Sequence, residues 1–196
     1  MLSHCLESGD NQKLARCMKI VGFELYRVDL RTRLPFQYGI ATMTQVPEIF
    51  VRLQVEFDHP PSAGFSSDCL PPKWFTKIPE KPLEEEVDEM LTVIRHALDE
   101  AVGIEGESVF ACWQSLYSAQ ERWANERHIP PLLAHFGTSL VERALIDAFC
   151  RARQVTFAQA ARDNSLKIDL GKMHPALRGK TPADFLPTGP RRNAIV

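Results

Sequence analysis

The stretch SLVERALIDA, residues 139–148, carries the most specific structural signal in this chain. Its apolar residues recur at every third or fourth position, which is the period of a helix with one buried face. Ser139 and Glu142 stand at the spacing of a capping box, so we expect the helix to begin at Ser139. Asp147 lies beside the apolar face, and we expect its carboxylate to bond a loop backbone group or an arginine across the helices.

Two further helices are predicted before this stretch. The first begins at Pro82, because proline suits the first helical position, and a run of glutamates then favours its N-terminal end. The second is capped by Ser108 and is ended by Pro130 and Pro131. A short fourth helix is expected from about residue 156, and the proline-rich and glycine-rich segment after it predicts no long element.

The N-terminal part of the chain predicts a small sheet. Residues 49–57 alternate apolar and polar side chains, which is the period of a half-buried strand. Residues 18–30 predict an earlier strand with an irregularity near Leu25–Tyr26, and residues 64–68 predict a short third strand. Strands at this spacing favour an antiparallel meander. The expected fold class is therefore α+β, a three-stranded antiparallel meander followed by a helical bundle.

The length of 196 residues suits one domain with flanking segments. We expect that domain over residues 18–165. Residues 1–17 do not resemble the start of a fold, so we expect a disordered or misannotated extension there, with the true start at Met1 or Met18 left open. Residues 166–196 are expected to be a connector or tail.

Charge and cysteine content exclude several classes of function. The net charge is −2 and no basic stripe is present, which argues against a nucleic-acid partner. No apolar run approaches the roughly 20 residues that span a bilayer, so we expect no membrane association. The five cysteines include no C-x-x-C pair, which argues against a disulfide framework or a zinc site. A reducing, cytoplasmic location fits this pattern.

The chain shows no motif for a self-contained active site. It has no P-loop, no G-x-G-x-x-G, no H-E-x-x-H and no G-x-S-x-G sequence. His128 and His135 are seven residues apart with two prolines between them, a spacing that favours a surface loop over a pair of metal ligands. Residues 84–86 are successive glutamates, which point in different directions on a helix. We therefore expect no catalytic residue, no metal site and no bound cofactor in this chain.

Aromatic residues in two loops are the candidate binding residues. Phe36 and Tyr38 precede the central predicted strand, and Trp74 and Phe75 follow it. Aromatic side chains on loops beside a rigid sheet can line a ligand pocket. The alternative is that they fill the joint between the sheet and the helices, and the sequence leaves both interpretations open.

The order of these elements resembles the N-terminal capping domain of the enolase superfamily, in its mandelate racemase and muconate lactonizing branch. The resemblance covers about residues 18–165 and is most specific over residues 139–148, which resemble the family pattern S-x-x-E-x-A-L-x-D-A. It implies a capping domain whose two loops close over the mouth of a (β/α)-barrel and select the substrate. The chain departs from the family at residues 64–68, where GFSSD stands in place of G-x-G-E.

By this resemblance, the first specificity loop is Phe36–Thr44 and the second is about Asp68–Thr76. The residues expected to face the substrate are Phe36, Tyr38, Gly39, Thr42, Trp74 and Phe75.

The resemblance also implies the chemistry of the complete enzyme. Its barrel binds Mg²⁺ and abstracts the proton next to a substrate carboxylate, as an isomerase or lyase: a racemase, epimerase, cycloisomerase or dehydratase. A barrel takes roughly 250 residues, so we expect the chain to be truncated before it and inactive alone. The expected partners are the barrel and a carboxylate substrate at the shared interface, with a homo-oligomer possible. The alternative function is a non-catalytic protein-interaction module; substrate and reaction stay open.

Overall fold

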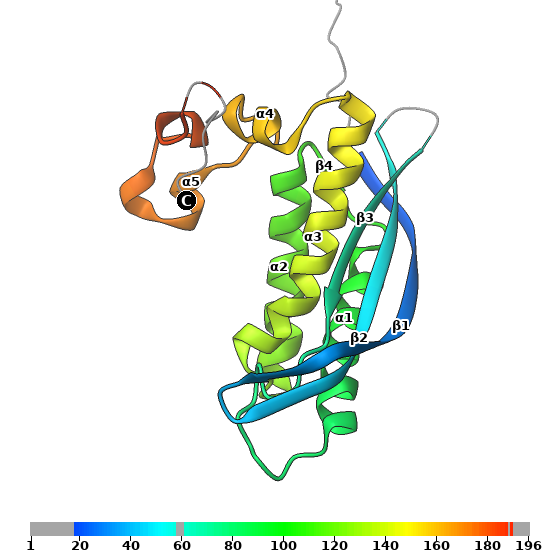
Figure 1. The fold of residues 1–196 in the computed structure, drawn as a ribbon. Coiled ribbons are helices and arrows are strands. Elements are labelled where there is room, and N and C mark those ends of the chain that lie inside the picture. Colours follow the sequence, from blue (N-terminus) through cyan, green and yellow to red (C-terminus); the bar gives the residue numbers. More distant parts are fainter. Residues whose placement is uncertain (1–17, 58–60, 188, 190–196) are drawn as a thin grey trace, which may run out of the picture.

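The computed structural model describes residues 18–57, 61–187 and 189. One antiparallel sheet packs against a layer of helices, with a smaller helical segment following (Figure 1). The strands are β1 (Met18–Tyr38), β2 (Ala41–Glu56), β3 (Ser62–Cys69) and β4 (Glu105–Gly106). The helices are α1 (Leu83–Ala101), α2 (Val109–Glu126), α3 (Pro131–Arg153), α4 (Phe157–Arg162) and α5 (Leu170–Met173), followed by 3-10 turns at Pro175–Leu177 and Pro182–Asp184.

The expected α+β class, a meander followed by a helical bundle, is confirmed. The number of strands differs from the three expected, because the described sheet has four strands, in the order β3-β2-β1-β4. The extra strand, β4, has two residues between α1 and α2, and it pairs with Met18 and Lys19 at the start of β1. An element this short leaves no periodicity in a sequence, so its pattern of side chains could not predict it.

β1 and β2 form one long hairpin, and this corrects the first predicted loop. Residues 36–44 were expected to form a flexible loop, but Phe36 pairs with Met43 and the turn is confined to residues 39–40. The predicted irregularity near Leu25–Tyr26 is also misplaced, because Leu25 pairs regularly with Val51. The ladder shifts register instead between Ile20 and Gly22 and between Arg31 and Phe36. The second shift contains Pro35, which has no N–H to donate to a ladder.

The core lies between the sheet and α1 and α3. Alternate side chains of β2 are almost fully buried, as the period of two predicts: Ile49, Val51, Leu53 and Val55. They meet the apolar stripe of α1, whose buried members include Met90, Ile94 and Leu98. Burial of these large aliphatic side chains supplies the main favourable free energy of folding.

α3 begins at Pro131, eight residues before the predicted start. Proline fits the first helical turn because its missing N–H would have no intrahelical partner there. Ser139 therefore lies inside the helix, where its hydroxyl donates to the Phe136 carbonyl at 2.8 Å instead of capping an end. The expected bond of Asp147 to backbone is present, since Oδ2 accepts the Phe65 N–H of β3 at 2.9 Å. Its arginine partner, Arg151, lies on the same helix at 2.7 Å.

The contact between β3 and α3 is too close for a side chain at Gly64. A Cβ atom at this position would lie 2.0 Å from the Ala144 carbonyl oxygen and 2.4 Å from the Ala148 nitrogen. Real Cβ atoms do not approach other atoms so closely, so glycine and the small alanines set the distance between the strand and the helix. We call this contact the seam, defined by Gly64, Ala144 and Ala148.

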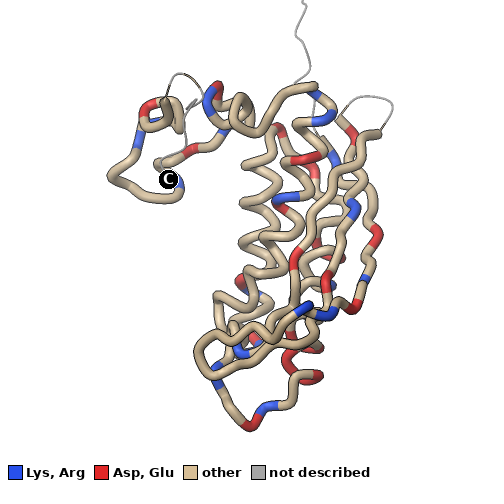
Figure 2. Tube along the Cα trace, in the orientation of Figure 1, with Lys and Arg blue, Asp and Glu red and all other residues tan. Residues whose placement is uncertain are grey.

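The segment after α3 projects from one end of the helical layer (Figure 1). α4 is the expected fourth helix, and a capping box of Thr156 and Gln159 forms its N-terminal end. The segment returns to the helices through the Phe110 N–H, which donates to the Leu166 carbonyl at 3.3 Å. Lys and Arg residues and Asp and Glu residues are both spread over the described chain (Figure 2). Among the described helices, none is long and apolar enough to cross a membrane.

Candidate functional site

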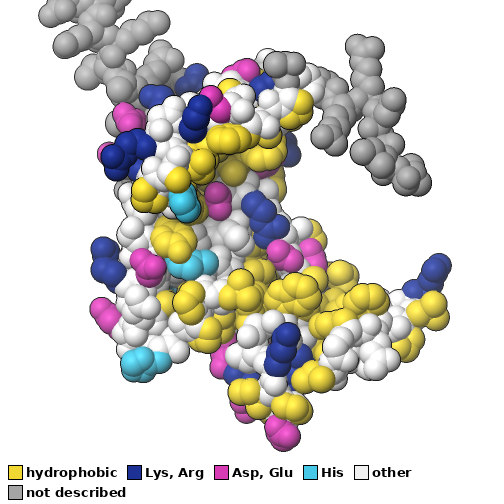
Figure 3. Space-filling view, turned by 90° about the vertical axis from the view of Figure 1, so that its left-hand side faces the viewer, with side chains coloured by type: hydrophobic (Ala, Val, Ile, Leu, Met, Phe, Trp, Pro, Cys, Tyr) yellow, Lys and Arg dark blue, Asp and Glu magenta, His cyan; other side chains and the backbone are white. Residues whose placement is uncertain are grey.

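The candidate site is a hollow of about 650 Å³ on the side of the molecule from which the β1–β2 hairpin and the α4–α5 segment project. On this face a band of hydrophobic side chains crosses the lower half (Figure 3). The hollow is bounded by the hairpin, by the end of β3 with the loop that follows it, and by the first half of α3. Its lining residues are Phe36, Tyr38, Met43, Asp68, Cys69, Pro71, Trp74, Phe75, Leu132, His135, Phe136 and Ser139.

The structure brings the four predicted loop aromatics together in this hollow. Phe36 and Tyr38 are two residues apart on β1, and their ring centroids are 5.6 Å apart. The Trp74 ring meets the Tyr38 ring edge-on, with a centroid distance of 6.3 Å. Phe75 packs against Phe136 of α3 with a centroid distance of 5.0 Å. Edge-on and tilted arrangements at these distances are favourable for aromatic rings. The rings therefore form a connected wall, although two of them, Phe36 and Trp74, keep more than half of their surface exposed.

The other two predicted specificity residues lie elsewhere. Gly39 is in the hairpin turn with a φ of +51°, a left-handed conformation that glycine adopts without a Cβ penalty. Thr42 is exposed on β2 opposite Gln37. Neither lines the hollow. Three apolar lining residues, Met43, Leu132 and Phe136, were not among the predicted ones. Met43 lay in the expected first loop but was not singled out, and Leu132 and Phe136 precede Ser139, where the helix was expected to begin.

A hydrogen bond joins the two sides of the hollow. The Tyr38 hydroxyl on the hairpin donates to the Pro72 carbonyl of the following loop at 2.6 Å. Burial raises the pKa of this hydroxyl, with smaller contributions from Cys69 and Glu86, so it stays protonated and remains a donor at neutral pH. The bond links the strand that carries Phe36 to the loop that carries Trp74, and both residues line the hollow.

Glu86 anchors the second loop, and the sequence did not identify it as different from its neighbours. Its carboxylate accepts the Lys73 N–H at 2.9 Å and the Thr76 hydroxyl at 3.3 Å, and it pairs with the Lys73 ammonium at 3.2 Å. Lys73 has a φ of +57°, an uncommon backbone conformation that these contacts hold in place. Since Glu86 is 4% exposed, the loop that carries Trp74 and Phe75 is tied to the first turn of α1 by a buried carboxylate.

A second buried polar group supports the helical wall of the hollow. The Gln120 amide on α2 is fully buried and donates to the carbonyls of Val93 on α1 and Ala134 on α3, each at 3.0 Å. Its oxygen meets Nδ1 of His96 at 2.7 Å, and the His96 ring stacks on Trp123. Gln120 thus joins three helices directly behind His135 and Phe136. Gln120 follows Leu116 by one helical turn and therefore lies on the apolar face of α2. A polar residue at such a position is the sequence signal that could have identified it.

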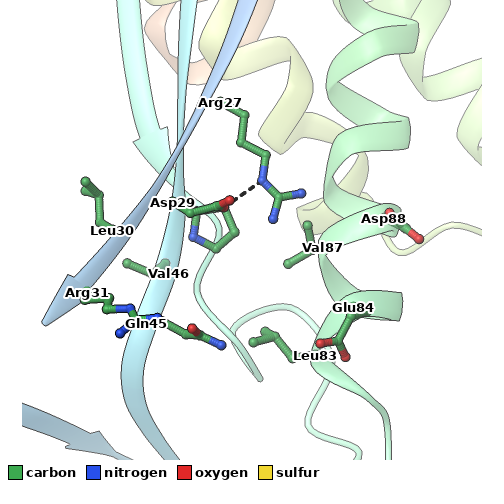
Figure 4. Close-up of a pocket in the computed structure, with 11 residues that line it drawn as sticks. Arg27, Asp29, Leu30, Arg31, Gln45, Val46, Leu83, Glu84, Val87 and Asp88 are labelled. Carbon is green, nitrogen blue, oxygen red and sulfur yellow. Dashed lines mark hydrogen bonds and ion pairs between the residues drawn. The ribbon is translucent and has the colours of Figure 1, made fainter.

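A second cavity, of about 540 Å³, separates β1 from the first half of α1 (Figure 4). Arg27, Asp29 and Arg31 extend into it from β1, while Glu84 and Asp88 line it from α1. Arg27 donates to the Asp29 carboxylate of its own strand at 2.8 Å. Because both positive and negative side chains line this wedge, it does not present a single charge that would bind a cation or an anion. We call it the charged wedge.

The described residues offer no group of three His, Cys, Asp or Glu side chains placed to hold a metal ion. The His128–His135 pair does not form a site: His128 lies in the turn after α2, whereas the His135 ring stacks on Tyr117 at 3.8 Å. The described cysteines, Cys69, Cys112 and Cys150, form no disulfide. A magnesium site is therefore not built from the described part of this chain.

The fold resembles a part of several solved proteins. A mandelate racemase/muconate lactonizing enzyme matches with a TM-score of 0.52 at 14% identity, covering 72% of this chain and 34% of its own. A related protein from Rubrobacter xylanophilus matches at 0.48 and 12%, covering 74% and 33%. An enolase from Bradyrhizobium, solved with magnesium and mandelic acid, matches at 0.46 and 13%, covering 70% and 32%.

The first of these matches has a TM-score above 0.5 and carries the fold comparison: the described chain shares its fold with part of a mandelate racemase/muconate lactonizing enzyme, as the resemblance in sequence predicted. The chain spans about a third of the length of each of these structures. At such low identity the likeness concerns the fold alone. No family model matches the chain, and no curated protein sequence matches it.

Proposed function

We propose that this chain is the substrate-covering lid of an enzyme that abstracts the proton next to a substrate carboxylate with the help of Mg²⁺. The single observation that carries the proposal is the apolar hollow, which gathers residues from both loops that the resemblance assigns to substrate selection. In the proposal the magnesium ion and the base belong to a (β/α)-barrel, because the described residues of this chain do not fit a metal site.

The shape of the molecule supports a barrel partner. The hairpin and the α4–α5 segment project on the same side, with α2 between them, and the resulting face is concave (Figures 1 and 3). Along α2 an aromatic row leads toward the hollow: Phe110 lies 5.4 Å from Trp113, and Trp113 lies 5.2 Å from Tyr117. A concave surface with a continuous apolar row is typical of an interface.

The contribution of this chain to such a reaction is to bind, orient and exclude water. Phe36 and Trp74 supply apolar surface at the opening, and Phe136 closes the helical side. Removal of water strengthens every electrostatic interaction between a substrate carboxylate and the groups of a facing barrel. The lid thus acts on substrate selection and on the dielectric environment, and the covalent chemistry takes place on the other domain.

The test is to find the barrel that the source genome encodes with this chain and to isolate the two together. Candidate carboxylates are then incubated in D₂O with Mg²⁺, and exchange of the α-proton is followed by ¹H NMR. We expect exchange with the assembled enzyme and a loss of at least roughly ten-fold with the barrel alone. Absence of any encoded barrel that binds this chain would overturn the proposal.

A second candidate function is a protein-interaction module, and the outer end of the hairpin favours it. Leu34 and Ile40 are both more than 60% exposed there, and Val28 and Leu30 on β1 are also exposed. Exposed apolar residues along one element mark an interface, which a second copy of the chain can also occupy. Light scattering after size exclusion distinguishes the outcomes: a concentration-dependent dimer lost in Leu34→Glu supports this function, and a monomer at all concentrations contradicts it.

A further inference from the structure

The wall of the hollow is apolar on all three sides. The hairpin contributes Phe36 and Met43, the following loop contributes Trp74, and α3 contributes Leu132 and Phe136. Its volume of about 650 Å³ lies in the range of small-molecule sites, which are mostly apolar with a few polar groups that fix orientation. The chemistry of those polar groups therefore decides which ligands the hollow accepts.

The polar side chains of the wall have their hydrogen bonds within the protein. Tyr38 donates to the Pro72 carbonyl, and the Ser139 hydroxyl donates to the Phe136 carbonyl. The Asp68 carboxylate pairs with Arg143 at 2.9 Å and accepts the Cys69 N–H at 3.0 Å. These groups are engaged with protein partners and are not directed at a ligand.

The remaining titratable groups on the wall, His135 and the Cys69 thiol, are uncharged at neutral pH, and for Cys69 this is because burial raises its pKa above the ordinary value. Nδ1 of His135 lies 3.2 Å from the Thr138 hydroxyl, and the ring stacks on Tyr117. Burial lowers the pKa of His135, and the more distant Glu121 only partly opposes this shift. None of the described residues that line the hollow is Lys or Arg. A charged or strongly polar group that entered would lose its hydration without a compensating partner.

We infer that the hollow binds a flat, uncharged apolar group, an aromatic ring above all, and that it excludes charged substituents. The inference rests on the proposed function in one respect: the ring is taken to be the part of a carboxylate substrate that lies farthest from its carboxylate. The carboxylate itself then points away from the hollow, toward the facing domain. Rings are favoured over branched chains because aromatic residues make up much of the wall, and aromatic rings pair favourably with a further ring in edge-on or offset arrangements.

The test titrates the full ¹⁵N-labelled chain, without any partner, with benzyl alcohol, phenylacetate and succinate. We expect saturable shifts of the Trp74 indole N–H and the Cys69 amide with both aromatic probes, and none with succinate. Trp74→Ala should weaken binding of both aromatic probes by roughly ten-fold. The matched control is Phe65→Ala, which removes an equally exposed aromatic ring from β3 outside the hollow and should leave both affinities unchanged.

A blocking variant covers the case in which Trp74→Ala alters the loop. Ser139→Phe adds a ring inside the hollow and should abolish the shifts while the remaining spectrum stays that of the folded chain. Absence of saturable shifts in the unaltered chain, or equal binding of succinate, would overturn the inference. Neither result bears on proton exchange by an assembled enzyme, so failure here and failure of the proposed lid function are distinguishable.

Discussion

β3 and α3 lie side by side, and the space between them differs completely from one end to the other. At the seam, Gly64 touches the α3 backbone with no room for a Cβ atom. At the other end, Asp68 and Cys69 stand apart from Phe136 across the hollow. Between these ends the Ser66 hydroxyl donates to the Leu140 carbonyl at 2.7 Å, and Arg143 donates to the Ser67 carbonyl at 3.1 Å. The same two elements thus change from direct backbone packing to an open space within a few residues.

This difference separates the residues that stabilise the fold from those that bind a ligand. Small residues at the seam allow close packing, and an added atom there has no space. Large residues at the hollow leave space unfilled, so their removal costs little packing but changes what the space accepts. The charged wedge differs from both, because charged side chains of β1 and α1 line it together with buried valines.

The largest expected effect is at the seam. Gly64→Ala places a Cβ atom against the Ala144 carbonyl and should lower the free energy of unfolding by about 3 kcal/mol. The measurement is urea unfolding followed by circular dichroism. Gly22→Ala is the control, because its Cβ would meet only the Gln54 side chain at 3.8 Å, and it should change stability by less than about 1 kcal/mol. Equal effects at the two glycines would show that the seam is not close-packed.

The next effect concerns the support behind the hollow. Gln120→Leu removes the two buried donors that join α1 and α3 to α2, and it should lower the free energy of unfolding by about 2 kcal/mol. Gln114→Leu on the same helix is the control, because the Gln114 carbonyl bonds only the exposed Lys172 ammonium. Thermal unfolding of both variants checks this. If they lose the same stability, the Gln120 bonds do not hold the wall together.

Glu142 lies on α3 between the seam and the hollow, and burial raises the pKa of its carboxyl above the ordinary value of 4.5 despite the opposing charge of Arg143. A raised folded-state pKa means that the charged form is penalised in the folded chain, and the penalty fades as pH falls through that pKa. Glu142→Gln should therefore raise the free energy of unfolding at pH 7 by about 1 kcal/mol.

The gain from Glu142→Gln should shrink as the pH falls toward 4.5, because the carboxyl of the unaltered chain then becomes neutral as well. Urea unfolding at pH 7 and at pH 4.5 measures both values. Glu121→Gln, at an exposed position on α2, is the control and should change the free energy of unfolding by less than about 0.5 kcal/mol. A constant difference between Glu142→Gln and the unaltered chain at both pH values would contradict the explanation by burial.

The smallest effect on stability is expected at the hollow itself. Trp74 is 58% exposed, so Trp74→Ala should lower the free energy of unfolding by only about 0.5 kcal/mol. The same substitution is expected to have a large effect on aromatic probes. A loss as large as that of Gly64→Ala would mean that the aromatic wall is a structural core, which is the alternative interpretation left open by the sequence.

Patterns with a fixed period predicted most of the fold. The alternation over residues 49–57 and the apolar stripe of α1 both correspond to buried faces. The spacing of apolar residues follows the geometry of a single strand or helix, so it can be read from the sequence alone. The start of α3 was predicted wrongly, since the spacing of Ser139 and Glu142 matches a capping box by coincidence inside a longer helix. A local pattern cannot distinguish a true helix end from such a match when Pro131, the real start, also resembles a terminator.

The site was predictable in part for a related reason. The loop positions of Phe36, Tyr38, Trp74 and Phe75 suggested a pocket, and the structure places all four around one hollow. Their role in substrate selection stays a prediction. Glu86 could not be singled out from three consecutive glutamates, because only the path of the following loop decides which carboxylate becomes buried.

The bond between Tyr38 and Pro72 has a mechanical consequence. It fastens the hairpin to the loop after β3, and Glu86 fastens that loop in turn to α1. The hairpin is therefore linked through two successive hydrogen bonds to a helix that lies far from it in sequence, so we expect a displacement of the hairpin to move the loop after β3 as well. Strain placed on one side of the hollow is then shared by the other side, so the hydrogen bond between Tyr38 and Pro72 couples the two sides mechanically as well as structurally.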